Sequence, residues 1–267
     1  MRTITKVEQQ KKNKRRYNIY LDGQFAFGVD EDIFIEHYLR KGMELSEEEI
    51  EQLLDEESIQ KAYTLAVRYL SYRIRSIQEM EDYLIKQEVD QIVLQRVIVR
   101  LLEEKLLDDA LFAQSFVADR KLLTSKGPTV IKRELMQKGI DEQIAHDAAY
   151  TYTFDEQVEK AEKWAQVQWK RRSKHPARKK REQIRVKLIQ KGFTKDVIDA
   201  VIEQLHTDDL VQTDSDIITK QADKLLTKYK RKYDGYELKM RVKSALYQRG
   251  FPQDAINEYM ENLNESM

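Results

Sequence analysis

The sequence contains no cysteine, and it has only 3 prolines and 8 glycines in 267 residues. The lack of cysteine excludes disulfide scaffolds, thiolate metal sites and cysteine nucleophiles, and it is typical of a reducing compartment. The scarcity of glycine and proline excludes collagen-like chains and leaves few places for tight turns. Long apolar runs are missing too, since no stretch approaches the roughly 18 residues of a membrane span, and the N-terminus lacks the apolar segment of a signal peptide. We therefore expect a cytoplasmic protein that does not enter a membrane.

Charged and helix-forming residues are abundant: 35% of the chain is charged and 41% is hydrophobic. The prevalence of Lys, Glu, Gln, Leu, Ile and Arg favours helix. So much charge suits an array with a large surface for its core better than one thick globule. The composition therefore predicts a mainly α protein.

The charges are distributed unevenly, although Lys plus Arg and Asp plus Glu both number 47. Residues 44–57 hold eight acids and no base, and Ser46 and Glu49 form a capping-box pattern, so we interpret this run as the solvated start of a helix. Residues 170–196 hold twelve bases and two acids, and residues 220–249 hold ten bases and three acids. Such a stretch can be a binding surface, neutralised by phosphates or by an acidic protein face. The alternative interpretation is a solvated linker between helices.

Alternation of apolar and polar residues, typical of strands, is confined to the first 30 residues. It continues on both sides of Asp22-Gly23, a dipeptide that favours a type I′ turn, and so predicts a β-hairpin. An earlier strand is expected around Thr3 to Glu8, and a short helix is expected after residue 30, ending near Gly42. We assign residues 1–57 to this N-terminal hairpin module.

Four later segments share a helix, turn, helix design: residues 80–98, 131–149, 184–202 and 242–260. Three of the turns place a glycine where a left-handed residue ends a helix, and Glu88 stands there in the first. A longer amphipathic helix precedes each pair, so each unit has three helices and recurs every 51 to 58 residues. Such units bury their faces by stacking. The sequence thus predicts tandem three-helix repeats at 58–107, 108–153, 154–207 and 208–267, forming an elongated, curved array.

Three segments of the first two repeats resemble the signatures of the RecX family of bacterial regulatory proteins. They are YRIRSIQEMEDYL (72–84), LLDDALFAQSFVADR (106–120) and GPTVIKRELMQKGI (127–140), and KLIQKGF in the third repeat continues the pattern. Shorter members of the family have three three-helix repeats. With a fourth repeat and the N-terminal module, this chain resembles the longer form.

The resemblance implies a function that composition does not. RecX proteins bind RecA filaments on single-stranded DNA, lie in the filament groove, and limit filament growth, ATP hydrolysis and strand exchange, which affects recombination, repair and the SOS response. The resemblance implies no enzyme activity and no cofactor, and we expect a monomer. Two alternatives stay open: a sequence-independent nucleic-acid-binding architectural protein, and a protein-interaction solenoid that does not depend on DNA. The sequence does not decide between capping, groove binding and disassembly of filaments.

The strongest candidate site is the basic stretch 170–187, with a second basic cluster at the equivalent place in the fourth repeat. Cations there also complement a helix C-terminus. Trp169 is the better candidate for stacking on a base, because Trp164 falls in an apolar stripe with Ala161 and Ala165. Arg73 and Arg75 either contact the partner or close the preceding helix. The predicted binding residues are Lys170, Arg171, Arg172, Lys174, Arg178, Lys179, Lys180, Arg181, Arg185, Lys230, Arg231, Lys232, Arg73, Arg75 and Trp169.

Other readings are weaker. The second helix of each pair is acidic, which disfavours a major-groove recognition helix. We interpret Asp108, Asp109 and the acids at 208–216 as helix caps rather than Mg²⁺ ligands. The four histidines lack zinc-site spacing, and SKGPTV (125–130) lacks the pattern of a phosphate-binding loop. We therefore expect no catalytic site, no metal site and no cofactor.

Overall fold

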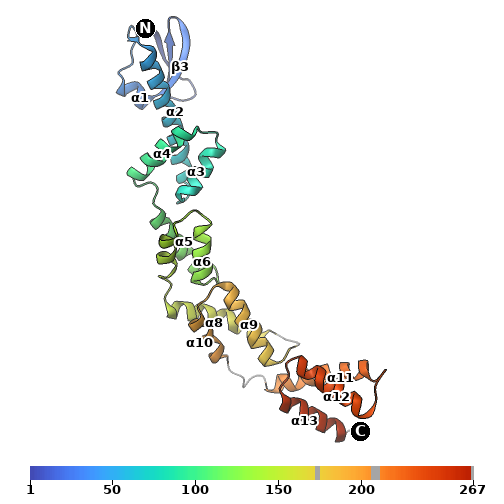
Figure 1. Cartoon of the computed structure of the whole chain (residues 1–267). Coiled ribbons are helices and arrows are strands. Elements are labelled where there is room, and N and C mark those ends of the chain that lie inside the picture. Colours follow the sequence, from blue (N-terminus) through green and yellow to red (C-terminus); the bar gives the residue numbers. More distant parts are fainter. Residues whose placement is uncertain (172–174, 206–210, 266–267) are drawn as a thin grey trace. The chain divides into compact units, whose positions relative to one another are not determined.

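The computed structural model describes residues 1–171, 175–205 and 211–265, which divide into two compact units. The first unit comprises Met1–Ser115 with Leu135–Ile144, and the second comprises Phe116–Glu134 with Ala145–Met267. Most of the described residues are helical, and the strands belong to the N-terminal module (Figure 1). Within the described part of the chain, no helix has both the length and the apolar character needed to cross a bilayer.

A small antiparallel sheet begins the chain, with the strand order β3-β2-β1-β4. Asp22 and Gly23 connect β2 to β3 with φ angles of 51° and 85°, as a type I′ turn requires. The predicted hairpin and the earlier strand are thus confirmed. Helix α1 (Glu31–Glu36) is shorter than expected, because the chain leaves it at His37. The strands are β1 (Arg2–Gln9), β2 (Arg16–Leu21), β3 (Gln24–Asp30) and β4 (Glu44–Leu45).

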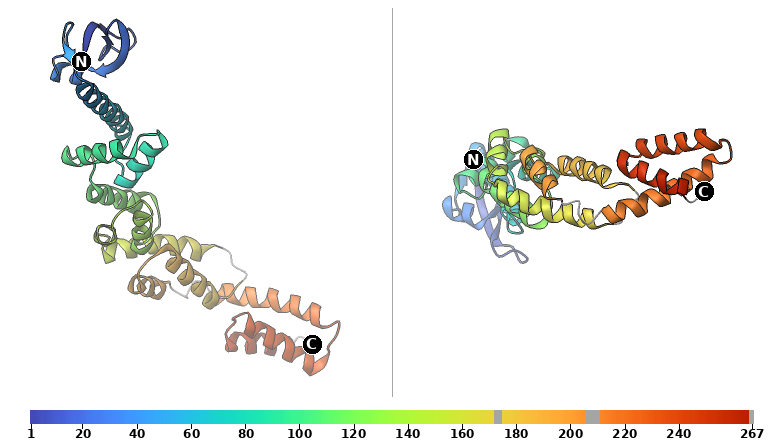
Figure 2. Two further views of the ribbon diagram at one scale, coloured as in Figure 1. Left: turned by 45° about the horizontal axis from the view of Figure 1, so that its top comes forward. Right: turned by 90° about the horizontal axis from the view of Figure 1, so that it is seen from below.

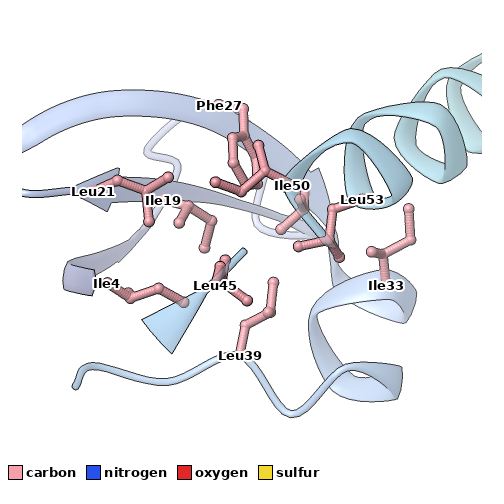
Figure 3. Packing of buried hydrophobic residues seen from close by; sticks show 10 residues of the cluster. Ile4, Ile19, Leu21, Phe27, Ile33, Leu39, Leu45, Ile50 and Leu53 are labelled. Atoms are coloured by element: carbon pink, nitrogen blue, oxygen red, sulfur yellow. The ribbon is translucent and has the colours of Figure 1, made fainter. Parts of the chain in front are cut away.

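One face of this sheet carries the core of the N-terminal module (Figure 3). Alternate residues of β2 and β3 point into it, because side chains along a strand alternate between faces. Helix α1 and the next helix, α2 (Glu47–Leu70), cover this face with Ile33, Ile50 and Leu53. The alternation seen in the sequence therefore produces a one-sided core.

Helix α2 (Glu47–Leu70) is one continuous helix of 24 residues, whereas we expected one helix to begin at Ser46 and another near residue 58. The Ser46–Glu49 capping box is present, with both of its hydrogen bonds. No glycine or proline interrupts residues 47–70, so the helix continues through the expected boundary at residue 57. Its first half packs on the sheet through Leu53, and its second half packs in the first repeat through Ala66.

One acid of the acidic run is buried instead of solvated. Glu57 is 2% exposed, accepts a hydrogen bond from the Asp30 N–H at 2.7 Å and forms an ion pair with Arg16. A buried carboxylate is stable only when such partners replace water. Glu57 therefore ties both strands of the hairpin to α2.

Three further sets of three helices follow the first. In the first, third and fourth repeats the three helices pack on one another, and Figure 2 shows those of the fourth in orange and red. The mainly helical fold with three-helix repeats is confirmed, and stacking into a curved array stays a prediction. The helices are α3 (Ile77–Lys86), α4 (Gln91–Glu103), α5 (Asp109–Leu123), α6 (Pro128–Met136), α7 (Glu142–Ala149), α8 (Phe154–Lys170), α9 (Ala177–Lys191), α10 (Lys195–Gln204), α11 (Val211–Tyr229), α12 (Gly235–Gln248) and α13 (Gln253–Glu265).

The turn between the second and third helices has the same conformation in every repeat. Glu88 has φ 59°, and the glycines at 139, 192 and 250 have φ of 80°, 84° and 90°. In each repeat, the N–H after this residue donates to the carbonyl of a fully buried leucine five positions earlier, at 3.1 to 3.3 Å. This is the pattern of a Schellman helix end. The predicted left-handed turns are confirmed, Glu88 included.

The start of the second helix in each of the first three repeats packs against the turn of the following repeat, and we call each such contact a joint. In the first joint, the Ser76 hydroxyl donates to the carbonyl of Lys138 at 2.8 Å. In the second, the Gly127 N–H donates to the carbonyl of Lys191 at 2.7 Å, and the Thr129 N–H donates to that of Gly192 at 3.2 Å. The first two joints thus hydrogen-bond the start of a helix in one repeat to a backbone carbonyl in the turn of the next.

The joints differ in how closely the backbones approach. A Cβ atom added to Gly127 would lie 2.3 Å from the carbonyl oxygen of Gly192, so only glycine fits there. In the third joint, Pro176 occupies the position of Gly127, and proline has no N–H to donate. A Cβ on Gly250 would find its nearest neighbour, the Lys179 Cβ, at 3.7 Å. The third joint is therefore a van der Waals contact at this point.

Candidate nucleic-acid interface

The basic stretch lies at the end of α8 and along α9. Lys170, Arg171, Arg178 and Lys179 are exposed there. Exposed basic side chains on one pair of helices form a surface that can neutralise phosphates. Arg172 and Lys174, which we also predicted as binding residues, lie outside the described residues.

Lys180 has an internal role instead of an exposed one. It is 9% exposed, and its ammonium donates to the carbonyl of Arg171 at 2.6 Å and also to that of Trp169. These carbonyls are left without helical partners where α8 ends, and a cation there also complements the helix dipole. The structure therefore assigns Lys180 to the helix end, in place of the predicted binding surface.

Two neighbouring arginines are engaged in similar internal contacts. Arg181 donates to the carbonyl of Leu205 at 2.7 Å, where α10 ends, and Arg185 pairs with Asp199 at 2.5 Å. These contacts connect α9 to α10. Both arginines are only partly exposed, so they add less to the basic surface than the sequence suggested.

Both tryptophans pack against the core of the third repeat, whereas we expected this only of Trp164. The Trp169 ring faces cations of its own chain, with the Lys180 ammonium 5.3 Å from the ring centroid and the Arg181 guanidinium 5.8 Å from it. Trp164 packs against the core of the third repeat, as expected, but it also lines an open groove. Trp164 is therefore the better placed of the two to meet a ligand.

This groove, which we call the α8–α9 groove, has a volume of about 660 Å³. The Lys191 ammonium lies 5.0 Å from the centroid of the Trp164 ring. Burial, with a smaller effect of the nearby Lys126 charge, lowers the pKa of Lys191 below its usual value. Apolar, amide and charged side chains all line the groove: Trp164, Ile184, Val186, Gln168, Gln183, Gln190, Arg171, Lys179, Lys180, Lys187 and Glu182.

The second basic cluster follows α11 in the fourth repeat. Lys230, Arg231 and Lys232 are exposed, as a partner surface requires. Tyr229 and Tyr233 meet edge to face beside them, and the Arg241 guanidinium lies 4.0 Å from the centroid of the Tyr233 ring. These three basic side chains are thus accessible, whereas the adjacent tyrosines pack within the repeat.

In the first repeat, the signature residues form the first joint. Ser76 is fully buried and caps α3 by accepting from the Glu79 N–H. Arg73 forms a bidentate ion pair with Glu79, and Lys138 pairs with the same carboxylate at 2.5 Å. The Arg75 guanidinium stacks 4.0 Å from the centroid of the Tyr69 ring. Arg75 thus packs on the last turn of the preceding helix α2, whereas Arg73 pairs with the first turn of the following helix α3.

Asp108 and Asp109, which we interpreted as helix caps, each accept from an N–H in the first turn of a helix. Asp108 accepts from the Leu111 N–H at 2.9 Å. Asp109 accepts from the Ile77 N–H at 2.9 Å, and burial raises the pKa of its carboxyl. Among the described side chains, no three His, Cys, Asp or Glu residues gather as metal ligands would. The acids at 208 and 209 lie outside the described residues.

Four family models, all of RecX domains, match successive parts of the chain. The model described as "Regulatory protein RecX N-terminal domain" matches residues 2–46, and models of the first, second and third RecX three-helix domains match residues 62–101, 108–148 and 212–260. The third model therefore falls on the fourth repeat of this chain. None of these four ranges includes residues 149–211, which hold the basic stretch.

Whole-chain relatives carry the same name. "Regulatory protein RecX" of Oceanobacillus iheyensis is 42% identical over 266 residues, covering 98% of both chains. That of Bacillus subtilis is 36% identical over 259 residues, covering 97% of both. A crystal structure of regulatory protein RecX matches 76% of this chain and 100% of its own, with 33% identity and a TM-score of 0.69. RecX from Lactobacillus salivarius matches 55% of this chain and 96% of its own, with 38% identity and a TM-score of 0.53.

Proposed function

Because the chain belongs to the RecX family, we propose that it binds RecA filaments on single-stranded DNA and restrains their growth, ATP hydrolysis and strand exchange. It acts by contact alone, without chemistry of its own, and works in the cytoplasm, where RecA filaments form. Its effect on recombination and repair follows from how much of a filament it occupies.

The observation that supports this proposal most is the accessible charge of the third repeat. Lys170, Arg171, Arg178 and Lys179 are exposed, and no described residue forms an ion pair with any of them. A nucleoprotein filament presents a continuous row of phosphates and acidic side chains, which such a surface can neutralise. The third repeat is also the one that lies between the second and third family domains, so it adds a contact to the shared framework.

The test reverses only exposed charges. Lys170, Arg171, Arg178 and Lys179 are changed together to Glu, which leaves the internal contacts of Lys180 and Arg181 in place. We expect at least tenfold weaker inhibition of RecA ATPase on single-stranded DNA, with an unchanged circular dichroism spectrum. The matched control reverses four exposed lysines elsewhere, Lys11, Lys12, Lys41 and Lys86, and keeps its inhibition. Full inhibition by the first variant would contradict the proposed surface.

An architectural nucleic-acid-binding protein would behave differently. Its affinity for bare DNA would fall steeply with salt and would not increase when RecA is present. A filament regulator binds preassembled RecA filaments far more tightly than bare DNA in the same buffer. Measuring both affinities at two salt concentrations separates these two functions.

A further inference from the structure

The α8–α9 groove combines two kinds of surface that one ligand class requires together. Trp164 and Ile184 supply an aromatic and aliphatic wall, and Arg171, Lys179 and Lys187 supply cations. Glu182 is the one acid among the residues that line it. Its volume of about 660 Å³ lies within the range of small-ligand sites. A ligand that fits has a flat apolar part and an adjacent negative charge.

We propose that the α8–α9 groove binds an unpaired nucleotide of single-stranded DNA, with the base stacked on Trp164 and the phosphate paired with the surrounding cations. This site rests on the proposed function and adds a direct DNA contact to it. Aromatic side chains inside a positively charged groove are how proteins hold single strands without reading sequence. Side-chain amides such as Gln168 and Gln183 can accept from or donate to the base edge.

Lys191 supports this assignment, because its ammonium already occupies a position over the Trp164 ring, 5.0 Å from the centroid. A base can take that position, since both cations and bases bind an aromatic face. The displaced ammonium sits on a flexible four-carbon chain and can then pair with a phosphate. The contact that now covers the ring therefore becomes part of the binding site.

The chain suits a direct test, because Trp164 and Trp169 are its only tryptophans. In Trp169→Phe the remaining fluorescence comes from Trp164, and in Trp164→Phe it comes from Trp169. We expect a 20-nucleotide oligo(dT) to quench Trp169→Phe and to leave Trp164→Phe nearly unchanged. Trp164→Ala should bind this oligonucleotide about 5- to 150-fold more weakly, the range measured for loss of one stacked base.

The proposal would be overturned if oligo(dT) quenched both Phe variants equally or did not quench Trp169→Phe. It would also be overturned if an oligoglutamate peptide quenched Trp169→Phe as strongly as oligo(dT) does, because the groove would then be a site for an acidic protein. Circular dichroism of each variant checks that it is folded. RecA ATPase inhibition is measured separately on the wild-type chain. If oligo(dT) quenches Trp164 but the wild type does not inhibit RecA, the groove assignment stands and the proposed function fails.

Discussion

Adding one methyl group at Gly127 tests the joint between the second and third repeats. Gly127 does not have a positive φ, so alanine is compatible with its backbone conformation. The added Cβ would lie 2.3 Å from the Gly192 oxygen and 2.4 Å from the Phe193 nitrogen, both of them backbone atoms. Because rotation of a side chain cannot relieve these contacts, the joint must open.

The structure allows the cost of Gly127→Ala to be worked out. Opening the joint lengthens two hydrogen bonds, Gly127 N–H to Lys191 and Thr129 N–H to Gly192, each worth about 1 kcal/mol. Overpacking adds about 1 to 3 kcal/mol. Replacing glycine by alanine returns about 0.4 to 1 kcal/mol through the unfolded chain. The variant should therefore lose about 2 to 4.6 kcal/mol of unfolding free energy.

Urea unfolding followed by tryptophan fluorescence measures this loss, because both tryptophans lie in the third repeat. The matched control is Gly28→Ala, another position without positive φ, where the added Cβ would meet the end of the flexible Gln10 side chain at 3.1 Å. We expect that control to change the unfolding free energy by less than about 1 kcal/mol. A Gly127→Ala protein with the urea midpoint of the wild type would refute the tight joint.

Three further predictions concern individual charges. Lys180→Met should lower the unfolding free energy by about 1 to 3 kcal/mol, because two carbonyls lose a charged donor. Lys179→Met should leave the unfolding free energy unchanged and weaken binding to DNA or filament. Equal urea midpoints for these two variants would contradict the internal role of Lys180. Glu57→Ala should cost about 3 to 5 kcal/mol in thermal or urea unfolding because Arg16 loses its buried partner, and a loss below 1 kcal/mol would argue against that tie. Burial raises the pKa of Glu79, but the hydrogen bonds and charges of Arg73 and Lys138 outweigh burial and hold this pKa below its usual value. The stabilisation from ionised Glu79 is therefore present above about pH 4.3, the unfolded value, and is lost as the pH falls through the lower folded value. Glu79→Gln should melt at a lower temperature than the wild type at pH 7, and the difference in Tm should close towards pH 3.

Local chemistry made the repeats predictable. In three repeats a glycine stands four positions after the buried leucine, where the turn requires positive φ, so its place in the sequence identifies the turn directly. The Asp22-Gly23 hairpin and the Ser46 capping box are predictable for the same reason, because the residues that define them lie within four positions of one another. The continuity of α2 was missed because helical patterns on either side of residue 57 suggested two elements, although nothing in that segment breaks a helix.

The binding residues were harder to predict because their roles depend on distant parts of the chain. Lys179 and Lys180 are adjacent and chemically identical, yet one is exposed and the other reaches the end of α8. The buried Glu57 likewise owes its position to Arg16, 41 residues away. Which tryptophan lines the α8–α9 groove depends on how the two helices pack, and composition or spacing does not contain that information.

The joints also bear on how chains of this kind change length. Each joint uses the first residues of one helix and the turn of the next unit, so every internal repeat contains both halves within its own stretch of sequence. An inserted unit preserves the existing contacts: Gly127 docks on the turn of the third repeat, and Pro176 then docks on the turn of the fourth. Duplication of a single unit thus lengthens the protein without redesigning its neighbours, and new binding residues can be acquired in the inserted copy alone.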